Sequence, residues 1–204
     1  MHSHMHWDHI GDPERIPLAR IVLGGESRSL LENAYPPNLS SFFLALPSSR
    51  PIEYIDFHAS SSESPETSTK WIRPFGSFDV AYDFYGDGSV YLVDAPGHVA
   101  GHMLAAVRVG PNTFVLLAGD TCHSRECYAG AQRMISKEMH GNFDVAQESV
   151  KRLGGVDKEL DEVLVILAHE WEREREIPLF PLALNGWALE QAETRKEERR
   201  RGRQ

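Results

Sequence analysis

The chain has 204 residues, of which 41% are hydrophobic and 25% charged, and its formal net charge is -9. A chain of this size can bury the core of one domain, so we expect a single domain over residues 1–204. The acidic balance argues against nucleic acid as a partner, because phosphate binding needs a basic surface. No apolar run approaches the roughly 20 residues that cross a bilayer, so we expect no membrane partner.

The cysteine content bears on the compartment. Cys122 and Cys127 are the two cysteines of the chain. They are too few for a disulfide framework, and free thiols are typical of a reducing compartment. We therefore expect a cytoplasmic protein. The oligomeric state stays open at this point.

The first nine residues contain a dense group of potential metal ligands. Residues 4–9 read H-M-H-W-D-H, an H-x-H-x-D-H pattern. Three imidazoles and a carboxylate form a donor set suited to zinc, and also to iron or manganese. In an extended or turning backbone His4 and His6 lie on one side, so Asp8 and His9 point elsewhere, toward a second ion. A histidine-rich start that arose by chance is the alternative.

The next part of the chain predicts little regular structure after its start. Residues 20–25 predict a strand that ends in a turn, and residues 27–34 predict a short helix. Prolines, serines and an acidic cluster then predict a long loop over 35–69. Its apolar side chains are candidates for a substrate wall: Tyr35, Phe42, Phe43 and Leu44. Packing of this group on a sheet is the alternative.

Two hairpins are predicted in the middle of the chain. Residues 78–84 and 89–93 flank a G-D-G turn, and residues 102–109 and 113–117 flank a G-P-N turn. Apolar residues bounded by such turn sequences are typical of paired antiparallel strands. We therefore expect two hairpins, each with a short connection.

Two helices and one strand are predicted in the last third. Apolar side chains recur at helical spacing over 144–153, and the pair Gly154 and Gly155 is expected to end that helix. The continuous apolar run 163–167 predicts a buried strand. Residues 188–204 predict a highly charged C-terminal helix or tail, with an arginine-rich end that we expect to be solvated.

Three further motifs follow apolar runs in a fixed order. They are D-A-P-G-H-V-A-G-H at 94–102, A-G-D at 118–120 and A-H-E at 168–170. Each places a histidine or aspartate just past a predicted strand, where a rigid scaffold presents it to a cleft. Any one of them is a weak signal, because such residues more often cap or bridge a loop. Together with the N-terminal run, the four in order indicate one site.

The four motifs resemble those of the metallo-β-lactamase-fold superfamily, in particular its lactonase-like hydrolases and their fungal relatives. The resemblance runs from Ser3 to about Glu170. It implies an α/β (α+β) protein with a four-layer αββα sandwich and a two-metal site between the sheets. In the superfamily several strands precede the first motif, so we expect a chain that is N-terminally incomplete.

The resemblance also implies a ligand for every expected position. His4, His6 and His98 correspond to the ligands of one metal; Asp8, His9 and His169 to those of the other; and Asp120 to the carboxylate that bridges both. Two such ions can share a water and lower its pKa toward 7, which gives a hydroxide nucleophile at neutral pH. The implied function is a dizinc hydrolase, with iron or manganese as alternative metals. Its implied substrate is a lactone, a thioester or a related small acyl compound.

One position departs from the family pattern. Many lactonases have a tyrosine three residues after the bridging carboxylate, and this chain has His123 there. An imidazole can also donate to a substrate carbonyl, so the candidate catalytic residues are Asp8, Asp120 and His123. Asp8 is the candidate for delivering a proton to the leaving group. A solvated loop histidine is the alternative for His123, and His102 is expected to support a ligand.

Two other functions remain open. One is an iron-dependent oxidoreductase of the same fold, either a persulfide dioxygenase with one iron or a flavodiiron protein. The full second ligand set, Asp8 with His9 and His169, argues against the first, and the lack of a flavin module in this sequence argues against the second. The other function is that of a truncated, non-catalytic remnant. Metal analysis distinguishes these alternatives.

Overall fold

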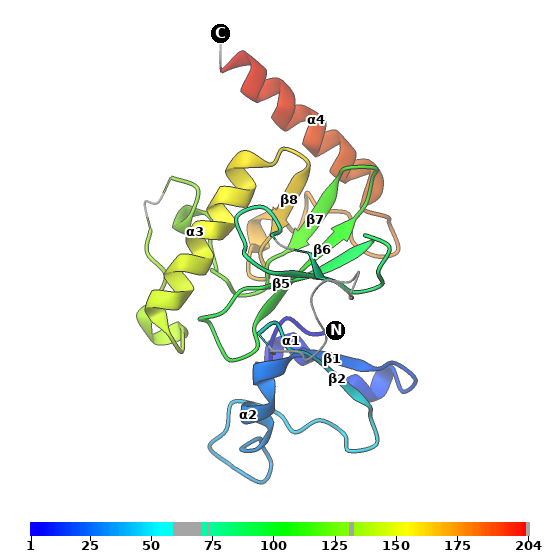
Figure 1. Ribbon diagram of the computed structural model, residues 1–204, viewed down its shortest axis with the longest axis vertical. Helices are drawn as coiled ribbons and strands as arrows, with labels where there is room; N and C mark the ends of the chain where they lie inside the picture. The colour runs from blue at the N-terminus through cyan, green and yellow to red at the C-terminus, as the bar shows by residue number, and fades with distance from the viewer. Residues whose placement is uncertain (59–70, 73, 131–132, 203–204) are drawn as a thin grey trace.

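A six-stranded sheet forms the centre of the protein (Figure 1). The computed structural model describes residues 1–58, 71–72, 74–130 and 133–202. The strands lie in the order β3 (Trp71–Ile72), β4 (Ala81–Asp83), β5 (Val90–Asp94), β6 (Met103–Arg108), β7 (Phe114–Leu117) and β8 (Val163–Ile166). Neighbours are antiparallel, except β7 and β8, which are parallel. Both predicted hairpins are confirmed as β4–β5 and β6–β7.

A second sheet pairs β1 (Ile21–Gly24) with β2 (Ile52–Ile55) in parallel. Side chains alternate across a strand, so β1 has two apolar faces. Val22 packs with Leu92 and Met103 of the larger sheet. Ile21 and Leu23 face the other way and contact the side chains of the short helix α2 (Arg28–Leu31). The smaller sheet is therefore buried between the larger sheet and α2.

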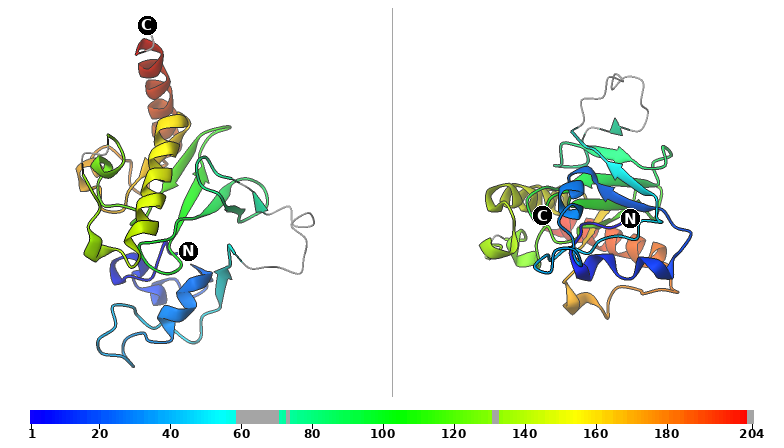
Figure 2. Two further views of the ribbon diagram at one scale, coloured as in Figure 1. Left: turned by 60° about the vertical axis from the view of Figure 1, so that its left-hand side comes forward. Right: turned by 90° about the horizontal axis from the view of Figure 1, so that it is seen from below.

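The long helices cover opposite faces of the larger sheet. The helix α3 (Phe143–Glu159) buries Leu153 and Val156 against Val93 and Leu104. The helix α4 (Asn185–Arg201) buries Ala188 against Val115 and Leu164 and then projects from the upper end of the molecule (Figures 1 and 2). The successive layers are α3, the six-stranded sheet, the two-stranded sheet and α2. This arrangement confirms the α/β class predicted from the sequence.

The remaining helical segments are single turns. They are α1 (Trp7–Ile10) and the 3-10 turns η1 (Pro13–Arg15), η2 (Gly25–Ser27), η3 (Arg125–Cys127), η4 (Lys137–Met139) and η5 (Trp171–Arg173). Among the described residues, none of the helices has the length and apolar character needed to span a membrane.

The predicted loop over 35–69 is wrong in its middle, where β2 lies. Four residues, I-E-Y-I, pair along the whole of β1, from Ile21 with Ile52 to Gly24 with Ile55. So short a run has little periodicity of its own, and its strand conformation depends on a partner about 30 residues earlier in the chain. Residues 59–69 of the predicted loop lie outside the described residues.

The predicted end of the helix at Gly154 and Gly155 is also wrong, because α3 continues to Glu159. Both glycines lie where another segment approaches the helix closely. A Cβ at Gly155 would lie 2.3 Å from Ser77 Oγ, and one at Gly154 would lie 3.1 Å from Tyr128 Cβ. These glycines therefore allow close packing, which outweighs their cost of about 1 kcal/mol each inside a helix.

The charged C-terminal helix begins at Asn185, three residues before its predicted start, and residues 203–204 lie outside the described part. Ion pairs attach it to the body of the protein. Arg195 Nη2 lies 3.1 Å from Asp157 Oδ1, and Arg199 Nε lies 2.6 Å from Asp161 Oδ1. These contacts, together with buried Ala188 and Ala192, fix a helix whose surface is otherwise mostly exposed.

Candidate metal centre

All four sequence motifs meet at one edge of the larger sheet. The strands β5, β7 and β8 run in the same direction, so the segments that follow them start at the same edge. The N-terminal segment joins this edge through its backbone: Met103 N donates to Ser3 O at 2.9 Å, and His2 N donates to Val22 O at 3.1 Å. The N-terminal motif therefore lies at the same edge as the three motifs that follow β5, β7 and β8.

One group of donors contains His4, His6, His98 and Asp120, whose ligand atoms all lie within 4.8 Å of one another. His6 Nδ1 lies 2.9 Å from His4 Nε2 and 3.1 Å from His98 Nε2. Three ring nitrogens therefore point toward one place. His4, His98 and Asp120 are buried, and the ring of His6 is stacked on that of Phe43 at 5.5 Å.

A second group contains Asp8, His9 and His169, also within 4.8 Å. The Nε2 atoms of His9 and His169 each lie 3.5 Å from Asp8 Oδ2. Asp120 lies between the groups: its Oδ2 is 3.3 Å from His9 Nε2 and its Oδ1 is 3.3 Å from His169 Nε2. The Asp8 and His169 side chains are 60% and 43% exposed, so this group faces solvent. The structure thus brings all seven predicted ligands together.

The donors fit a pair of divalent cations. Buried polar groups are normally hydrogen-bonded, yet Asp120 Oδ1 and His9 Nε2 are buried and have no hydrogen-bond partner among the described residues. Burial lowers the pKa of His4 and lowers that of His98 to about 3, so both rings are neutral at pH 7 and keep a free lone pair. Neutral imidazoles around a carboxylate form a donor set typical of zinc and other first-row metals.

The loop that presents His98 is fastened to the start of α3. Asn142 caps α3 with its side chain, and its N–H donates to Gly97 O at 2.9 Å. Gly141 N donates to His98 O at 2.8 Å. On the outer side of the ring, His98 Nδ1 lies 3.3 Å from Nδ1 of the buried His140. His98 is therefore fixed on both its backbone and its ring, and its Nε2 faces the donor group.

His102 holds the backbone of Asp120. Its Nδ1 lies 2.9 Å from Ala95 O and its Nε2 accepts from Asp120 N at 3.1 Å. A carbonyl cannot donate, so the proton is on Nδ1 and the ring is neutral. Burial lowers the pKa of His102 to about 4, in agreement with this state. The expected supporting role of His102 is thus visible as a hydrogen bond to the residue predicted to bridge the metals.

The neutral state of His102 predicts how pH affects the metal-free protein. The pKa of a histidine in the unfolded chain is near 6.5, whereas that of folded His102 is about 4. Between these pH values the unfolded state binds a proton at this residue and the folded state does not. Stability is therefore lost as pH falls from 6.5 to 4, by about 3 kcal/mol for this residue. Urea unfolding of chelator-treated protein at pH 7.5 and 4.5 measures the loss. His102→Gln should reduce the pH dependence; an equal dependence in the variant would contradict the assignment.

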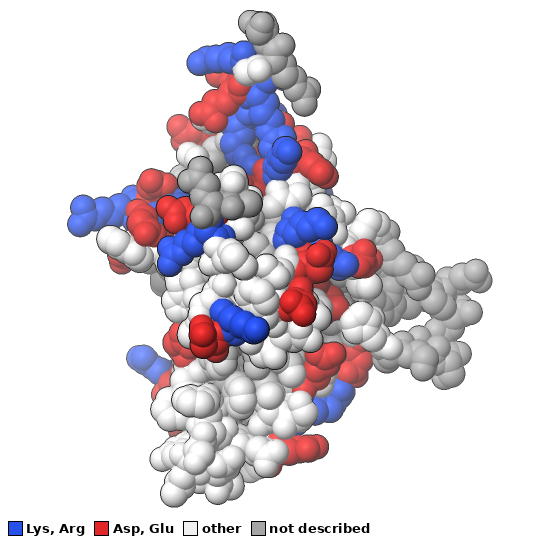
Figure 3. Space-filling model, turned by 90° about the vertical axis from the view of Figure 1, so that its left-hand side faces the viewer, with Lys and Arg blue, Asp and Glu red and all other residues white. Residues whose placement is uncertain are grey.

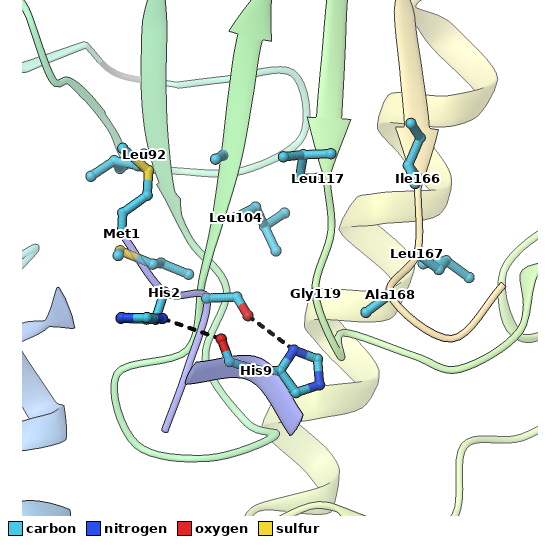
Figure 4. A pocket seen from close by; sticks show the side chains of 13 residues that line it. Met1, His2, His9, Leu92, Leu104, Leu117, Gly119, Ile166, Leu167 and Ala168 are labelled. Carbon is cyan, nitrogen blue, oxygen red and sulfur yellow. Dashed lines mark hydrogen bonds between the residues drawn. The ribbon is translucent and has the colours of Figure 1, made fainter. Parts of the chain in front are cut away.

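His9 is held from its other ring nitrogen (Figure 4). Its Nδ1 lies 3.4 Å from Ser3 Oγ, and its backbone O lies 3.2 Å from His2 Nδ1. Behind the ring is a mainly apolar cavity of about 280 Å³, lined by side chains that include Leu117 and Ile166. On the opposite side of the ring, Nε2 of His9 lies 3.3 Å from Asp120 Oδ2.

A larger cavity of about 610 Å³ opens over the donors. Its apolar lining consists of Trp7, Phe42 and Met139, and its polar lining consists of His6, Asp8, His98, Asp120, His123 and His169. Phe42, one of the candidates for a substrate wall, therefore lines this cavity. The other candidates do not line this cavity: Phe43 stacks on His6, Tyr35 lies beside Trp7, and Leu44 packs in the core near β1.

Several functional contacts were not predicted from the sequence. His140 lies against His98 from 42 residues farther along the chain, and no motif in the sequence links the two. Trp7 and Met139 were not expected in the cavity lining. Trp7 stands between His6 and Asp8, so its position in the first motif was a usable signal. Met139 had no such signal, because only the fold places η4 beside the donors.

Comparisons with known proteins give both relatives and a fold. The chain is 30% identical to the metallo-hydrolase mfmC of Annulohypoxylon moriforme over 94% of its own length and 58% of that protein. It is 34% identical to a protein of Gibberella moniliformis named a gamma-lactamase, over 95% of its length and 75% of that relative. No family model matches the chain. The chain thus spans little more than half the length of the first of these relatives.

A solved structure has the same fold. B. thuringiensis AiiA, in a form with N-decanoyl-L-homoserine bound at the active site, superposes with a TM-score of 0.60 at 19% identity. The superposition covers 88% of this chain and 58% of that protein. At this identity the likeness concerns the arrangement of strands and helices.

Proposed function

The chain belongs to the metallo-β-lactamase-fold superfamily, in its lactonase-like branch, and from this premise we propose that it is a metal-dependent hydrolase of small cyclic acyl compounds. One observation supports this above the others. The cavity over the donors is lined by histidines, carboxylates and three apolar side chains, without a hydroxyl or thiol group among its described lining residues. Water is therefore the nucleophile that this site favours.

The nearby thiol does not change this conclusion. Cys122 is fully buried two residues after Asp120, and burial raises its pKa to about 12. A thiol of this kind is protonated at neutral pH, and the thiolate is the nucleophilic form. Cys122 is thus a small packing residue.

Two metal sites follow from the two donor groups. His4, His6 and His98 would hold one cation, Asp8, His9 and His169 the other, and Asp120 would contact both. Zinc is the proposed metal, because imidazole nitrogens and carboxylate oxygens are both ordinary zinc ligands. Bound divalent cations supply acidity to a water and polarise a carbonyl. Asp120 would offset their positive charge from a buried position, where the low dielectric strengthens the attraction between opposite charges.

Asp8 is proposed to move a proton to the leaving group. Its carboxylate is 60% exposed at the cavity and lies 3.5 Å from Nε2 of both His9 and His169. When the ring of a lactone or lactam opens, the departing oxygen or nitrogen needs a proton, and a group at the mouth of the site can exchange it with solvent. The two histidines fix the carboxylate for this transfer.

The substrate class is proposed from the names of the relatives and from the lining of the cavity. One relative is named for lactams with five-membered rings, and the solved neighbour binds an opened homoserine that has a decanoyl chain. Lactones and lactams differ by one ring atom and open through the same attack on a carbonyl. We therefore propose a five-membered lactone or lactam with an apolar substituent.

The test is a metal and substrate panel on the purified chain. Metal analysis is expected to give two zinc ions per chain, and chelation followed by added Zn²⁺ should remove and restore turnover. Ring-opening is expected with γ-lactones, N-acyl homoserine lactones and γ-lactams, and less with aryl esters, acyl thioesters and β-lactams. Cleavage of β-lactams alone would contradict the lactonase-like assignment. Iron with dioxygenase activity would favour the oxidoreductase alternative instead.

The apolar lining predicts a preference for long acyl chains. Phe42 is 77% exposed at the cavity, and covering such a ring with a substrate tail contributes about 2 kcal/mol. The segment 35–49 has no charged residue, and the lower end of the face in Figure 3, where it lies, is largely free of charge. Phe42→Ser should lower kcat/KM for a decanoyl substrate roughly tenfold to thirtyfold. Short-chain substrates should change little.

A matched control is available in the same segment. Leu39 is 81% exposed and does not line the cavity. Leu39→Ser should leave the chain-length preference unchanged. Equal losses with the butanoyl and decanoyl substrates in Phe42→Ser would show that Phe42 does not contact the tail.

A further inference from the structure

We propose that His123 is an eighth metal ligand, which binds the cation on the Asp8, His9 and His169 side; this inference rests on the proposed function. Asp120, His123 and His169 form a third group of donors, with ligand atoms within 4.8 Å of one another. His123 thus shares His169 with the second donor group and Asp120 with the first, a position that differs from the hydrogen bond to a substrate carbonyl considered from the sequence.

The distances around Asp120 support a ligand role. His123 Nε2 lies 3.2 Å from Asp120 Oδ2. The corresponding distance to the carboxylate is 3.3 Å for His9 and His169 and 3.5 Å for His98, all of which are predicted ligands. The distance from His123 to the Asp120 carboxylate is thus as short as those of these three predicted ligands.

These distances are those of two ligands on one ion. Metal–nitrogen and metal–oxygen bonds of about 2.0 to 2.2 Å at angles of 90° to 109° place the two ligand atoms about 2.9 to 3.5 Å apart. A charge-assisted N–H···O bond is shorter, at about 2.7 to 2.9 Å. The His123–Asp120 separation of 3.2 Å lies in the first range, and it is at the upper end of the range of an ordinary N–H···O hydrogen bond, about 2.7 to 3.2 Å.

The ring of His123 is already oriented for this role. It meets the ring of His169 edge-on at 4.9 Å, and it is stacked at 6.3 Å on the ring of buried His140. The contact with Asp120 places Nε2 on the side of the donors. The side chain is 34% exposed in the cavity, so binding an ion there does not require burial of a further charge.

The consequence is a solvent-facing metal site richer in nitrogen than the resemblance implies. Its donors would be Asp8, His9, His169, His123 and Asp120, compared with three histidines and Asp120 on the other side. The second group is the more exposed one, with Asp8 and His169 both partly open to solvent. An added imidazole would therefore raise the affinity of this site for the cation. In this role His123 retains the second metal and is not a donor to the substrate.

Cobalt binding tests the proposal without use of turnover. Metal-free protein is titrated with Co²⁺, whose visible absorption reports the number and type of ligands, and a chelator competition gives the affinity of each equivalent. His123→Gln keeps an N–H donor but is a poor ligand. It should bind the first equivalent as the wild type does, bind the second at least about tenfold more weakly and show altered bands for that equivalent.

Two further variants control the experiment. His123→Asp offers an anionic ligand without a donor and should recover part of the second-site affinity. His58→Gln changes an exposed histidine outside the cavity and should bind both equivalents normally. Wild-type affinity and bands in His123→Gln would overturn the proposal while leaving the proposed function intact. A wild type that binds fewer than two equivalents would instead contradict the proposed function.

Discussion

Replacing His4 and His6 together by alanine is expected to remove one metal equivalent and nearly all turnover. The two rings supply two of the three nitrogens that converge in the buried donor group, with His6 Nδ1 2.9 Å from His4 Nε2. His98 and Asp120 alone are too few donors to hold the ion. The loss of activity should be at least about a thousandfold, the scale of losing a preorganised electrostatic group at a reacting carbonyl.

The measurement is metal content by mass spectrometry together with kcat/KM for the best lactone or lactam. His58→Ala is the control, since this histidine pairs with Asp94 at the surface and does not line the cavity over the donors. Thermal unfolding of both metal-free variants checks that the fold persists. Two tightly bound ions in the double variant would refute the ligand assignment.

Gly97→Ala is expected to cost more stability than any other single glycine substitution at the site. Gly97 has φ of 118°, and an added Cβ would lie 2.2 Å from Ala146 N and 2.5 Å from Ala146 Cα in α3. The helix start and the loop with His98 must then separate, which breaks the bond from Asn142 N to Gly97 O. We expect a loss of at least about 4 kcal/mol and weak metal binding.

Alanine substitutions at two other glycines distinguish backbone strain from steric contact as the cause of the stability loss in Gly97→Ala. Gly130→Ala introduces a Cβ at φ of 98° with no atom of the described residues within 4 Å, so it measures mainly backbone strain, about 1 to 2 kcal/mol. Gly186→Ala lies in α4 in open space without a positive φ and should be neutral or stabilising by up to about 1 kcal/mol. Urea unfolding of metal-free protein compares the three. A Gly97→Ala loss no larger than that of Gly130→Ala would show that the contact with α3 relaxes easily.

Two of the donor residues, Asp120 and His98, are held in place by contacts that do not involve a metal. Neutral His102 fixes the backbone of Asp120, and the start of α3 fixes the backbone of His98. In both contacts the supporting residue is not one of the seven predicted ligands. The donors are thus positioned mainly by the fold, which explains why a substitution at Gly97 should reduce metal binding although glycine has no ligand atom.

The amino-acid sequence by itself determined the donors and the strands that carry them. H-x-H-x-D-H and the three strand-end motifs are local patterns, and strand direction then sends the ends of β5, β7 and β8 to one edge. Both hairpins were also predictable, since turn residues and apolar runs occur within a few positions of each other. Asp83 strengthens the first by accepting from Gly86 N and Gly88 N, each at 2.9 Å.

Only the tertiary structure decided the contacts between residues far apart in the chain. β2 is a strand because β1 lies beside it, and within α3 Gly154 and Gly155 lie where Tyr128 and Ser77 leave no room for a side chain. The pairing of His140 with His98, 42 residues apart, likewise depends on packing. Periodicity and turn chemistry act over a few residues, whereas these contacts arise from burial between segments that sequence spacing does not relate.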